Sequence, residues 1–170
     1  MDNSLGEDRC FLLRCYRKPV TGDRLGEPDE TFVVNLSNPS NGTIADGQGV
    51  GTTIDDEPRI SINDVTNAEG KFHKTTQFTF IVTLSAAYDQ PVTVSFQTVN
   101  GTATTSDGDY VANTGSLTFR PGETMKTITI QVRGDNTKEA DEYFYLDLFG
   151  NSSNSLLAKK RGLGTLLNDD

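Results

Sequence analysis

The residues of this chain that could do chemistry are carboxylates gathered in four segments. One segment, residues 135–142, carries four of them within eight positions. The others surround residue 69, fill positions 107–109 and close the chain at 168–170. If these segments connect the strands of a β-sandwich at one end, their acids meet in a small volume. The carboxylates are Glu69, Asp107, Asp109, Asp135, Glu139, Asp141, Glu142, Asp169 and Asp170.

Carboxylates gathered so closely require a counter-ion. Two like charges about 4 Å apart repel by roughly 1 kcal/mol in water, and by more where solvent screens less. Ca²⁺ removes this repulsion because it accepts about 6–8 oxygen ligands with flexible geometry, whereas Mg²⁺ requires a stricter octahedron. The acidic segments therefore indicate a Ca²⁺ site. The alternative, in which the acids only solvate the tips of loops, stays open at this point.

Composition excludes several other classes of function. The chain has 15 Lys and Arg against 24 Asp and Glu, whereas binding to nucleic acid or to anionic membranes requires a basic surface. Cys10 and Cys15 have no second pair and no nearby histidine, so a zinc site is not expected. No apolar run is long enough to span a bilayer, so we expect no direct membrane insertion of this fragment.

The chain also lacks the residues expected of an enzyme. His73, the one histidine, is expected in a surface loop, and the sequence offers no Ser-His or Cys-His arrangement for nucleophilic catalysis. A glycosidase would need two carboxylates at a set separation in a cleft with aromatic side chains. There is no Trp, and the acids form one crowded group. We therefore expect no catalytic activity.

The sequence repeats itself with a period near 112 residues. Residues 20–32 match residues 132–144 at an offset of 112, with identical residues at seven positions. Residues 49–57 match residues 162–170 at an offset of 113. Because the units of a solenoid are much shorter, this period indicates an array of whole domains.

The repeat divides the chain into three parts. Residues 20–57 are expected to be the C-terminal fragment of one copy, and residues 58–170 the whole of the next. Residues 1–19 are charged and differ in style from the rest, which predicts a non-native or disordered leader. The partial copy offers only two strands, too few for a stable core. This hairpin is expected to be loose, to pack on the complete domain, or to be completed by another chain.

Apolar and polar residues alternate through the complete copy, a pattern typical of half-buried strands. Seven such stretches, with turns between them and no helical periodicity, predict an all-β fold. Their number and spacing indicate an immunoglobulin-like Greek-key sandwich. The expected strands are 59–63, 78–84, 92–97, 117–119, 127–132, 144–148 and 163–167.

Three motifs of the complete copy, in this order, resemble those of the Calx-beta domain. They are residues 101–110 (GTATTSDGDY), 115–123 (GSLTFRPGE) and 135–144 (DNTKEADEYF). The resemblance covers residues 56–170, and residues 23–57 resemble the end of a preceding copy. The family occurs, often in tandem, in sodium–calcium exchangers, an integrin beta subunit and large bacterial surface proteins. We therefore expect tandem repeats of a bacterial-type surface or adhesion protein.

The resemblance also implies a role for the acids, because some members bind Ca²⁺ at the apex of the sandwich. Others have lost ligands and act as spacers. Asn168 stands where the first copy has Asp55, and its side chain can still offer a carbonyl oxygen. The partial copy lacks the partner loops of a full site, so no complete site is expected there. The expected ligands are Glu69, Asp107, Asp109, Asp135, Glu139, Glu142, Asp169 and Asp170.

We therefore expect a Ca²⁺-binding module of a larger extracellular or cell-surface protein. Ca²⁺ would stiffen the loops and the junction between copies, where the short linker 55–58 ends in Pro58. The expected partners are neighbouring copies and a protein or carbohydrate adhesion target, with no nucleic acid. The alternative is a spacer or protein-interaction sandwich whose calcium site has degenerated.

Overall fold

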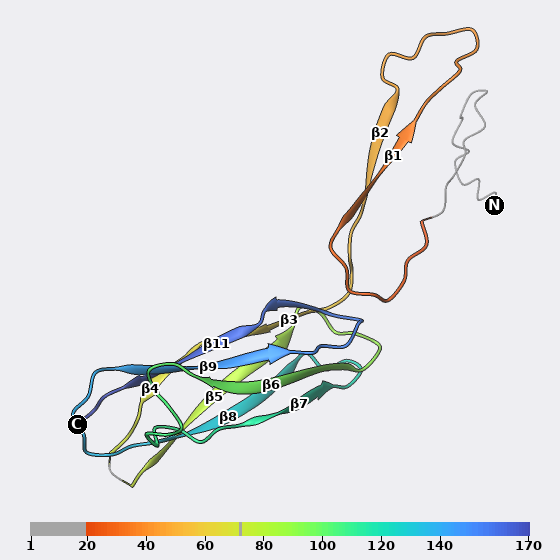
Figure 1. Cartoon of the computed structure of the whole chain (residues 1–170). Coiled ribbons are helices and arrows are strands. Elements are labelled where there is room, and N and C mark those ends of the chain that lie inside the picture. Colours follow the sequence, from red (N-terminus) through yellow and green to blue (C-terminus); the bar gives the residue numbers. More distant parts are fainter. Residues whose placement is uncertain (1–19, 72) are drawn as a thin grey trace, which may run out of the picture.

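The computed structural model describes residues 20–71 and 73–170, so the prediction for residues 1–19 lies outside the described part. Within it the chain forms eleven strands and no helix, and therefore no helix that could cross a membrane. The strands build one small sheet and two large ones (Figure 1). The small sheet is a hairpin of β1 (Glu30–Asn35) and β2 (Gln48–Thr53).

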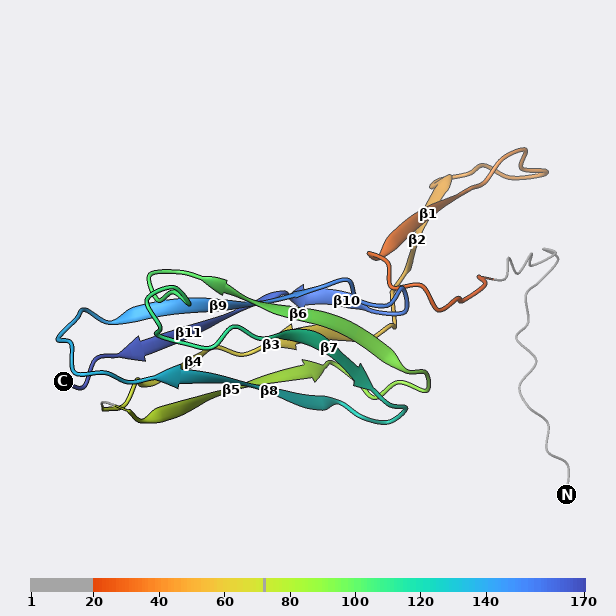
Figure 2. The same ribbon diagram turned by 60° about the horizontal axis from the view of Figure 1, so that its bottom comes forward.

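The two large sheets pack face to face as a sandwich (Figure 2). One sheet has the order β10-β3-β5-β8 and the other the order β4-β11-β9-β6-β7. The first consists of β10 (Leu156–Lys159), β3 (Arg59–Ile62), β5 (Thr75–Leu84) and β8 (Met125–Arg133). The second consists of β4 (Val65–Ala68), β11 (Arg161–Leu167), β9 (Glu142–Phe149), β6 (Val92–Asn100) and β7 (Thr114–Phe119).

The core explains why the alternating pattern forms strands. In β8 the side chains of Ile128, Ile130 and Val132 are buried, while their polar neighbours face solvent. Strand pleating sends successive side chains to opposite faces, so each apolar residue reaches the space between the sheets. Around Phe144 the rings of Phe78, Phe80 and Tyr110 pack with centroids 5.9, 6.0 and 4.5 Å away. The prediction of an all-β sandwich is confirmed.

The strand count differs from the predicted seven, because the complete copy has nine strands. The first expected strand, 59–63, corresponds to β3, and the unpredicted β4 follows it where the chain crosses from one sheet to the other. Asn63 Oδ1 accepts a hydrogen bond from Ile81 N at 2.6 Å, and Asp64 Oδ1 accepts one from Leu163 N at 2.8 Å. At the crossing, these side chains accept the hydrogen bonds that backbone carbonyls accept elsewhere in a sheet. On either side of it, β3 pairs with β5 and β4 pairs with β11. The short β10, parallel to β3, is the other strand missing from the prediction.

The hairpin has the same register as the last two long strands of the complete copy. Phe32 pairs with Gly51 in the hairpin, and Phe144 pairs with Gly164 in the sandwich. Both pairs obey the offsets found in the sequence, so β1 corresponds to β9 and β2 to β11. The equivalent side chains differ in burial: Phe32 is 39% exposed and Phe144 is fully buried. The hairpin thus presents an apolar face that the described chain does not cover.

The two ends of the sandwich differ in what they carry. The hairpin joins one end, and the C-terminus lies at the other (Figures 1 and 2). At the C-terminal end, β5 begins, β8 ends and β9 begins, so the β4–β5 and β8–β9 connections lie beside the end of β11. This end is called the acidic end below, and the end beside the hairpin is called the base.

Candidate metal centre

The parallel pairing of β4 with β11 places Glu69 beside the last residues of the chain. Ala68 lies opposite Leu167, and Glu69 N continues the ladder by donating to Leu167 O at 3.1 Å. Gly70 N then donates to the Asp169 carboxylate at 3.1 Å. Two segments almost one hundred residues apart are therefore held together by backbone hydrogen bonds. One carboxylate oxygen of Asp169 is therefore already occupied as a hydrogen-bond acceptor.

A close approach of two glycines brings Asp135 to the same place. Gly134 follows β8, and its nitrogen donates to Lys74 O at 3.0 Å. A Cβ atom built on Gly134 would lie 1.5 Å from Gly70 O, about the length of a covalent bond. Gly70 itself has φ +93°, which favours glycine. The absence of a side chain at Gly134 therefore allows the Glu69 and Asp135 segments to touch.

Glu69, Asp135 and Asp170 form the tightest group of carboxylates. One oxygen of each lies within 4.8 Å of the others. Glu69 is half-buried, and its pKa is raised to about 7 by burial and by the charges of neighbouring carboxylates. These neighbours are Asp135, Glu139, Asp170 and Asp169. A divalent cation in this position would replace that repulsion with attraction.

A second acidic group lies beside the first, around Glu142 at the start of β9. Burial and the charges of Asp109, Glu139 and Asp107 raise the pKa of Glu142 to about 7. The β6–β7 loop is shaped for this placement, because Asp109 accepts a hydrogen bond from Thr104 N at 2.7 Å. Arg133 N donates to Asp109 O at 2.8 Å, which ties the loop to the end of β8. Because Glu139 acts on both Glu69 and Glu142, the two groups are neighbours.

All eight carboxylates named from the sequence thus lie at the acidic end, but they play different parts. Glu69, Asp135 and Asp170 converge, and Asp109, Glu142 and Glu139 lie around them. Asp107 is exposed and accepts a hydrogen bond from the Thr104 hydroxyl at 3.0 Å, so it also orders its own loop. The eight remain predicted ligands.

Asn168 and Asp141, also noted in the acidic segments, hold the loops together. Asn168 N donates to the Asp141 carboxylate at 3.1 Å, and its side-chain amide donates to Glu139 O at 2.7 Å. The Asn168 Oδ1 atom accepts from Asp170 N at 2.8 Å. Gly134 was missed as a site residue, although its recurrence as Gly22 in the first copy was a visible signal.

The partial copy has the same local structure in its acidic segments. Asp23 accepts from Leu25 N at 2.8 Å, as Asp135 accepts from Thr137 N at 2.5 Å. Asp55 N donates to Asp29 at 3.1 Å, which matches the contact of Asn168 with Asp141. A hollow of about 240 Å³ lies at these acidic segments, beside the linker. Its lining includes Asp23, Glu27, Glu30, Asp55, Asp56 and Glu57.

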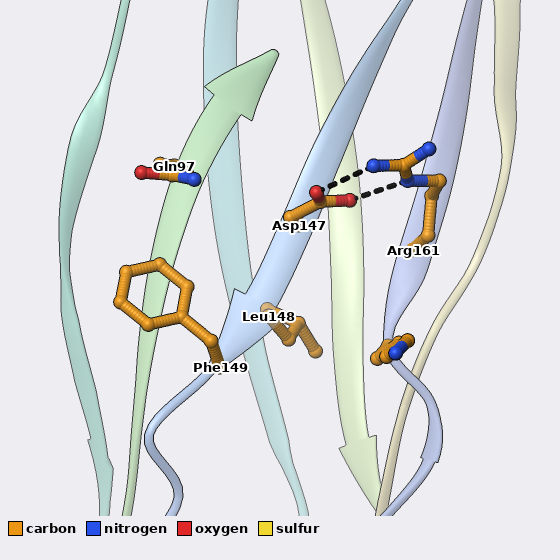
Figure 3. A pocket seen from close by; sticks show the side chains of 6 residues that line it. Gln97, Asp147, Leu148, Phe149 and Arg161 are labelled. Atoms are coloured by element: carbon orange, nitrogen blue, oxygen red, sulfur yellow. Dashed lines mark hydrogen bonds and ion pairs between the residues drawn. The ribbon is translucent and has the colours of Figure 1, made fainter.

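A larger hollow, of about 510 Å³, lies elsewhere, on the outer face of β6, β9 and β11 (Figure 3). Its main polar feature is an ion pair between Arg161 and Asp147, with N–O distances of 2.6 and 2.7 Å. These residues face each other in the β9–β11 register, and the guanidinium carbon lies 4.4 Å from the Tyr145 ring centroid. The charges of Arg161 and Asp147 therefore satisfy each other within this hollow.

The raised pKa values of Glu69 and Glu142 predict how pH affects the metal-free domain. Between the usual 4.5 and about 7, the folded domain holds protons that the unfolded chain has released. The free energy of unfolding therefore falls as pH rises through this window and levels off above it. After discounting for solvent screening of these half-buried groups, we expect a loss of about 1 kcal/mol per carboxyl.

Urea denaturation in EDTA, at about pH 5 and again above the folded pKa of about 7, measures this loss. Carboxyls with lowered pKa, such as Asp64 beside Lys159, change below the window and do not hide it. A free energy of unfolding that stayed constant or rose with pH would contradict the prediction.

Comparison with solved structures reproduces the sandwich. The calcium binding domain CBD12 of CALX1.1 aligns with a TM-score of 0.57 and 27% identity, over 66% of this chain and 46% of that one. The apo-form Calx CBD1 domain aligns with a TM-score of 0.56 and 25% identity, over 68% of this chain and 100% of that one.

Two curated relatives are large proteins. Extracellular matrix protein 3 of Lytechinus variegatus is 30% identical over 158 residues, which is 86% of this chain. Adhesion G-protein coupled receptor V1 of Danio rerio is 30% identical over 134 residues, or 76% of this chain. The chain spans only 5% and 2% of the lengths of these two proteins.

The family comparison covers most of the chain and finds the repeat as well. The Calx-beta domain model matches twice, at residues 12–66 and at residues 53–162. The two matches correspond to the hairpin segment and to the sandwich, whose registers are equivalent. The chain therefore belongs to the Calx-beta family and contains a partial copy of its domain followed by a full one.

Proposed function

We propose that the complete domain binds Ca²⁺ at its acidic end, and that the ion joins loops which otherwise repel one another. The observation that carries this proposal is the convergence of Glu69, Asp135 and Asp170, with carboxylate oxygens within 4.8 Å. Glu139, Asp109 and Glu142 would supply further oxygens, and their charges already act on this part of the acidic end. Ca²⁺ suits a shell built from several loops because its coordination is flexible and takes about 6–8 oxygens.

The surroundings of the site support a resident ion rather than a solvated acidic surface. Burial, together with repulsion from neighbouring carboxylates, raises the pKa of both Glu69 and Glu142. Both carboxyls are therefore partly shielded from solvent. The solved relative CBD12 of CALX1.1 is itself described as a calcium binding domain. Its resemblance to this chain supports the same role for the sandwich described above.

The proposed setting is a large extracellular protein built from tandem copies. Calx-beta modules are non-catalytic, and the curated relatives are matrix and adhesion-receptor proteins. In that setting Ca²⁺ would stiffen the apex of each domain and its junction with the next copy. The proposed partners are neighbouring Calx-beta copies and an adhesion target, either a protein or a carbohydrate.

Thermal and chemical unfolding with and without Ca²⁺ tests the proposal. At 100 times its dissociation constant, Ca²⁺ should raise the free energy of unfolding by about 2.7 kcal/mol over the value in EDTA. Calorimetric titration measures the binding directly, and Asp135→Asn should weaken it because one converging carboxylate is lost.

Magnesium at the same concentration is the control, because the stricter octahedral demand of Mg²⁺ fits loop carboxylates less well. Identical melting in Ca²⁺ and EDTA, with no heat on titration, would overturn the proposal. The domain would then act as a spacer or as a protein-interaction sandwich with a degenerated site.

A further inference from the structure

The first acidic loop of the partial copy, residues 23–28, reaches across to the base of the complete domain. Its clearest contact is an ion pair in which the Arg24 guanidinium donates to both oxygens of Asp89, at 2.5 and 2.9 Å. The guanidinium carbon lies 5.9 Å from the Tyr88 ring centroid. Planar, two-point contacts of this kind fix orientation as well as distance. Arg24 therefore meets a matched acceptor on the neighbouring copy.

A backbone contact beside the ion pair requires glycine. Gly26 N donates to Ser153 O at 2.8 Å. A Cβ atom built on Gly26 would lie 2.8 Å from the backbone carbonyl carbon and oxygen of Ser155. Both neighbours are backbone atoms, which cannot turn aside as the end of a flexible side chain can. Any larger residue at position 26 would therefore hold the loop away from the base.

The linker supplies the other attachment between the copies. Only residues 54–58 separate β2 from β3, and Glu57 in this linker is 7% exposed. The Tyr88 hydroxyl donates to the Glu57 carboxylate at 3.4 Å, and Arg59 pairs with Asp55 at 3.3 Å. A single covalent connection leaves rotation about the linker free. Because the loop is tethered nearby, even a weak second contact is favoured by its high effective concentration.

The equivalent loop of the complete copy does not have these features. At the offset of 112, Asn136 stands in place of Arg24, and Lys138 in place of Gly26. The Asp135 turn is nevertheless the same as the Asp23 turn. The contacts to the base therefore do not follow from the acidic turn itself. They depend on two residues that distinguish the first copy from the second.

We propose that Arg24 and Gly26 dock the partial copy's acidic loop on the base of the complete domain and set the orientation of the two copies without a metal ion. The base, formed by Tyr88, Asp89 and residues 153–155, is thus a binding surface for a preceding Calx-beta copy. It fits a copy whose loop has arginine directly after the turn aspartate and glycine two residues later. This docking is independent of Ca²⁺ binding at the acidic end of the complete domain.

Nuclear magnetic resonance of the full chain in EDTA tests the docking with two readouts. The first is the pKa of Asp89, which its contact with Arg24 lowers. It should return to an ordinary value in Arg24→Ala, and also in Gly26→Ala, where Arg24 is intact but the loop is displaced. The second is alignment of the hairpin amides with the sandwich in residual dipolar couplings, which both variants should lose.

Two further variants separate docking from simple damage. Gly22→Ala is the matched control, because a Cβ atom there meets nothing within 4 Å, and it should change neither readout. Arg24→Asp combined with Asp89→Arg should restore the shared alignment that either single change removes.

The pKa of Asp89 can be measured even if the two-stranded hairpin frays, because Asp89 belongs to the complete domain, between β5 and β6. An Asp89 pKa that is the same in the wild type, Arg24→Ala and Gly26→Ala would overturn the proposal. So would docking that appears only when Ca²⁺ is added. Neither result would affect the proposed Ca²⁺ site, which calorimetry tests separately.

Discussion

Replacing Gly134 by alanine is expected to destabilise the complete domain and to abolish tight Ca²⁺ binding together. The added methyl would lie 1.5 Å from Gly70 O and 2.2 Å from Gly70 C, so the β4–β5 connection must move away. Overpacking of this kind costs about 1–3 kcal/mol, and this contact belongs at or above the upper limit because both partners are backbone. The same movement separates Glu69 from Asp135, whose oxygens must share one ion.

Urea denaturation in EDTA measures the stability change for Gly134→Ala, and calorimetry measures its Ca²⁺ binding. Gly49→Ala is the matched control, because a methyl group on that strand glycine would meet no atom within 4 Å and its φ is not positive. It should leave both quantities within experimental error. Wild-type stability and affinity in Gly134→Ala would show that the two connections do not approach as described.

Replacing Glu69 by glutamine is expected to have opposite effects on the metal-free and the Ca²⁺-bound domain. Without metal above about pH 7, it removes a charge that repels Asp135, Glu139, Asp169 and Asp170. The variant should therefore be more stable than the wild type, by up to about 1 kcal/mol after solvent screening. With Ca²⁺ it loses a central anionic ligand, and we expect affinity to fall by at least the roughly 10–100-fold that loss of an outer-shell partner costs.

Thermal melts of Glu69→Gln and wild type, in EDTA and in Ca²⁺, show whether the change in stability has opposite signs in the two conditions. Glu123→Gln serves as the control, because Glu123 lies at the opposite end of β8 and pairs with Lys126 at 2.7 Å. Losing that pair should lower stability slightly and equally in both conditions. A Glu69→Gln domain that is destabilised without metal, or that keeps wild-type affinity, would remove Glu69 from the proposed ligands.

Much of the fold was predictable because the sequence alternates so regularly. Ile128, Ile130 and Val132 were expected on one face of a strand, and all three are buried between the sheets. Strand β4 was not predictable, because the alternation of the expected strand 59–63 gives no sign that Asn63 and Asp64 then bond across to β5 and β11. Strand β10 was not predicted because its four residues, LLAK, do not alternate between apolar and polar types.

The candidate site was predictable in place but not in detail. Each acid lies in a connection between expected strands or after the last of them, so convergence at one end was expected from the sandwich. The distances between the carboxylates depend on tertiary contacts that residue spacing in the sequence does not reveal, such as the approach of Gly134 to Gly70. From the sequence, the presence of Asn168 in the second copy where the first has Asp55 indicates only a change in the type of ligand. In the structure Asn168 also bonds to the Glu139 carbonyl, so it supports the loop that carries a predicted ligand.

The placement of the acidic end and the base at opposite ends of the sandwich has a geometric consequence for longer arrays. A contact that joins unlike surfaces of successive units does not close on itself unless the rotation between units completes a ring. In an array whose copies carry the equivalents of Arg24 and Gly26, repetition of this docking generates a polar rod with a constant screw between units. Cation-binding apices then recur along it once per domain, and its two tips are chemically distinct.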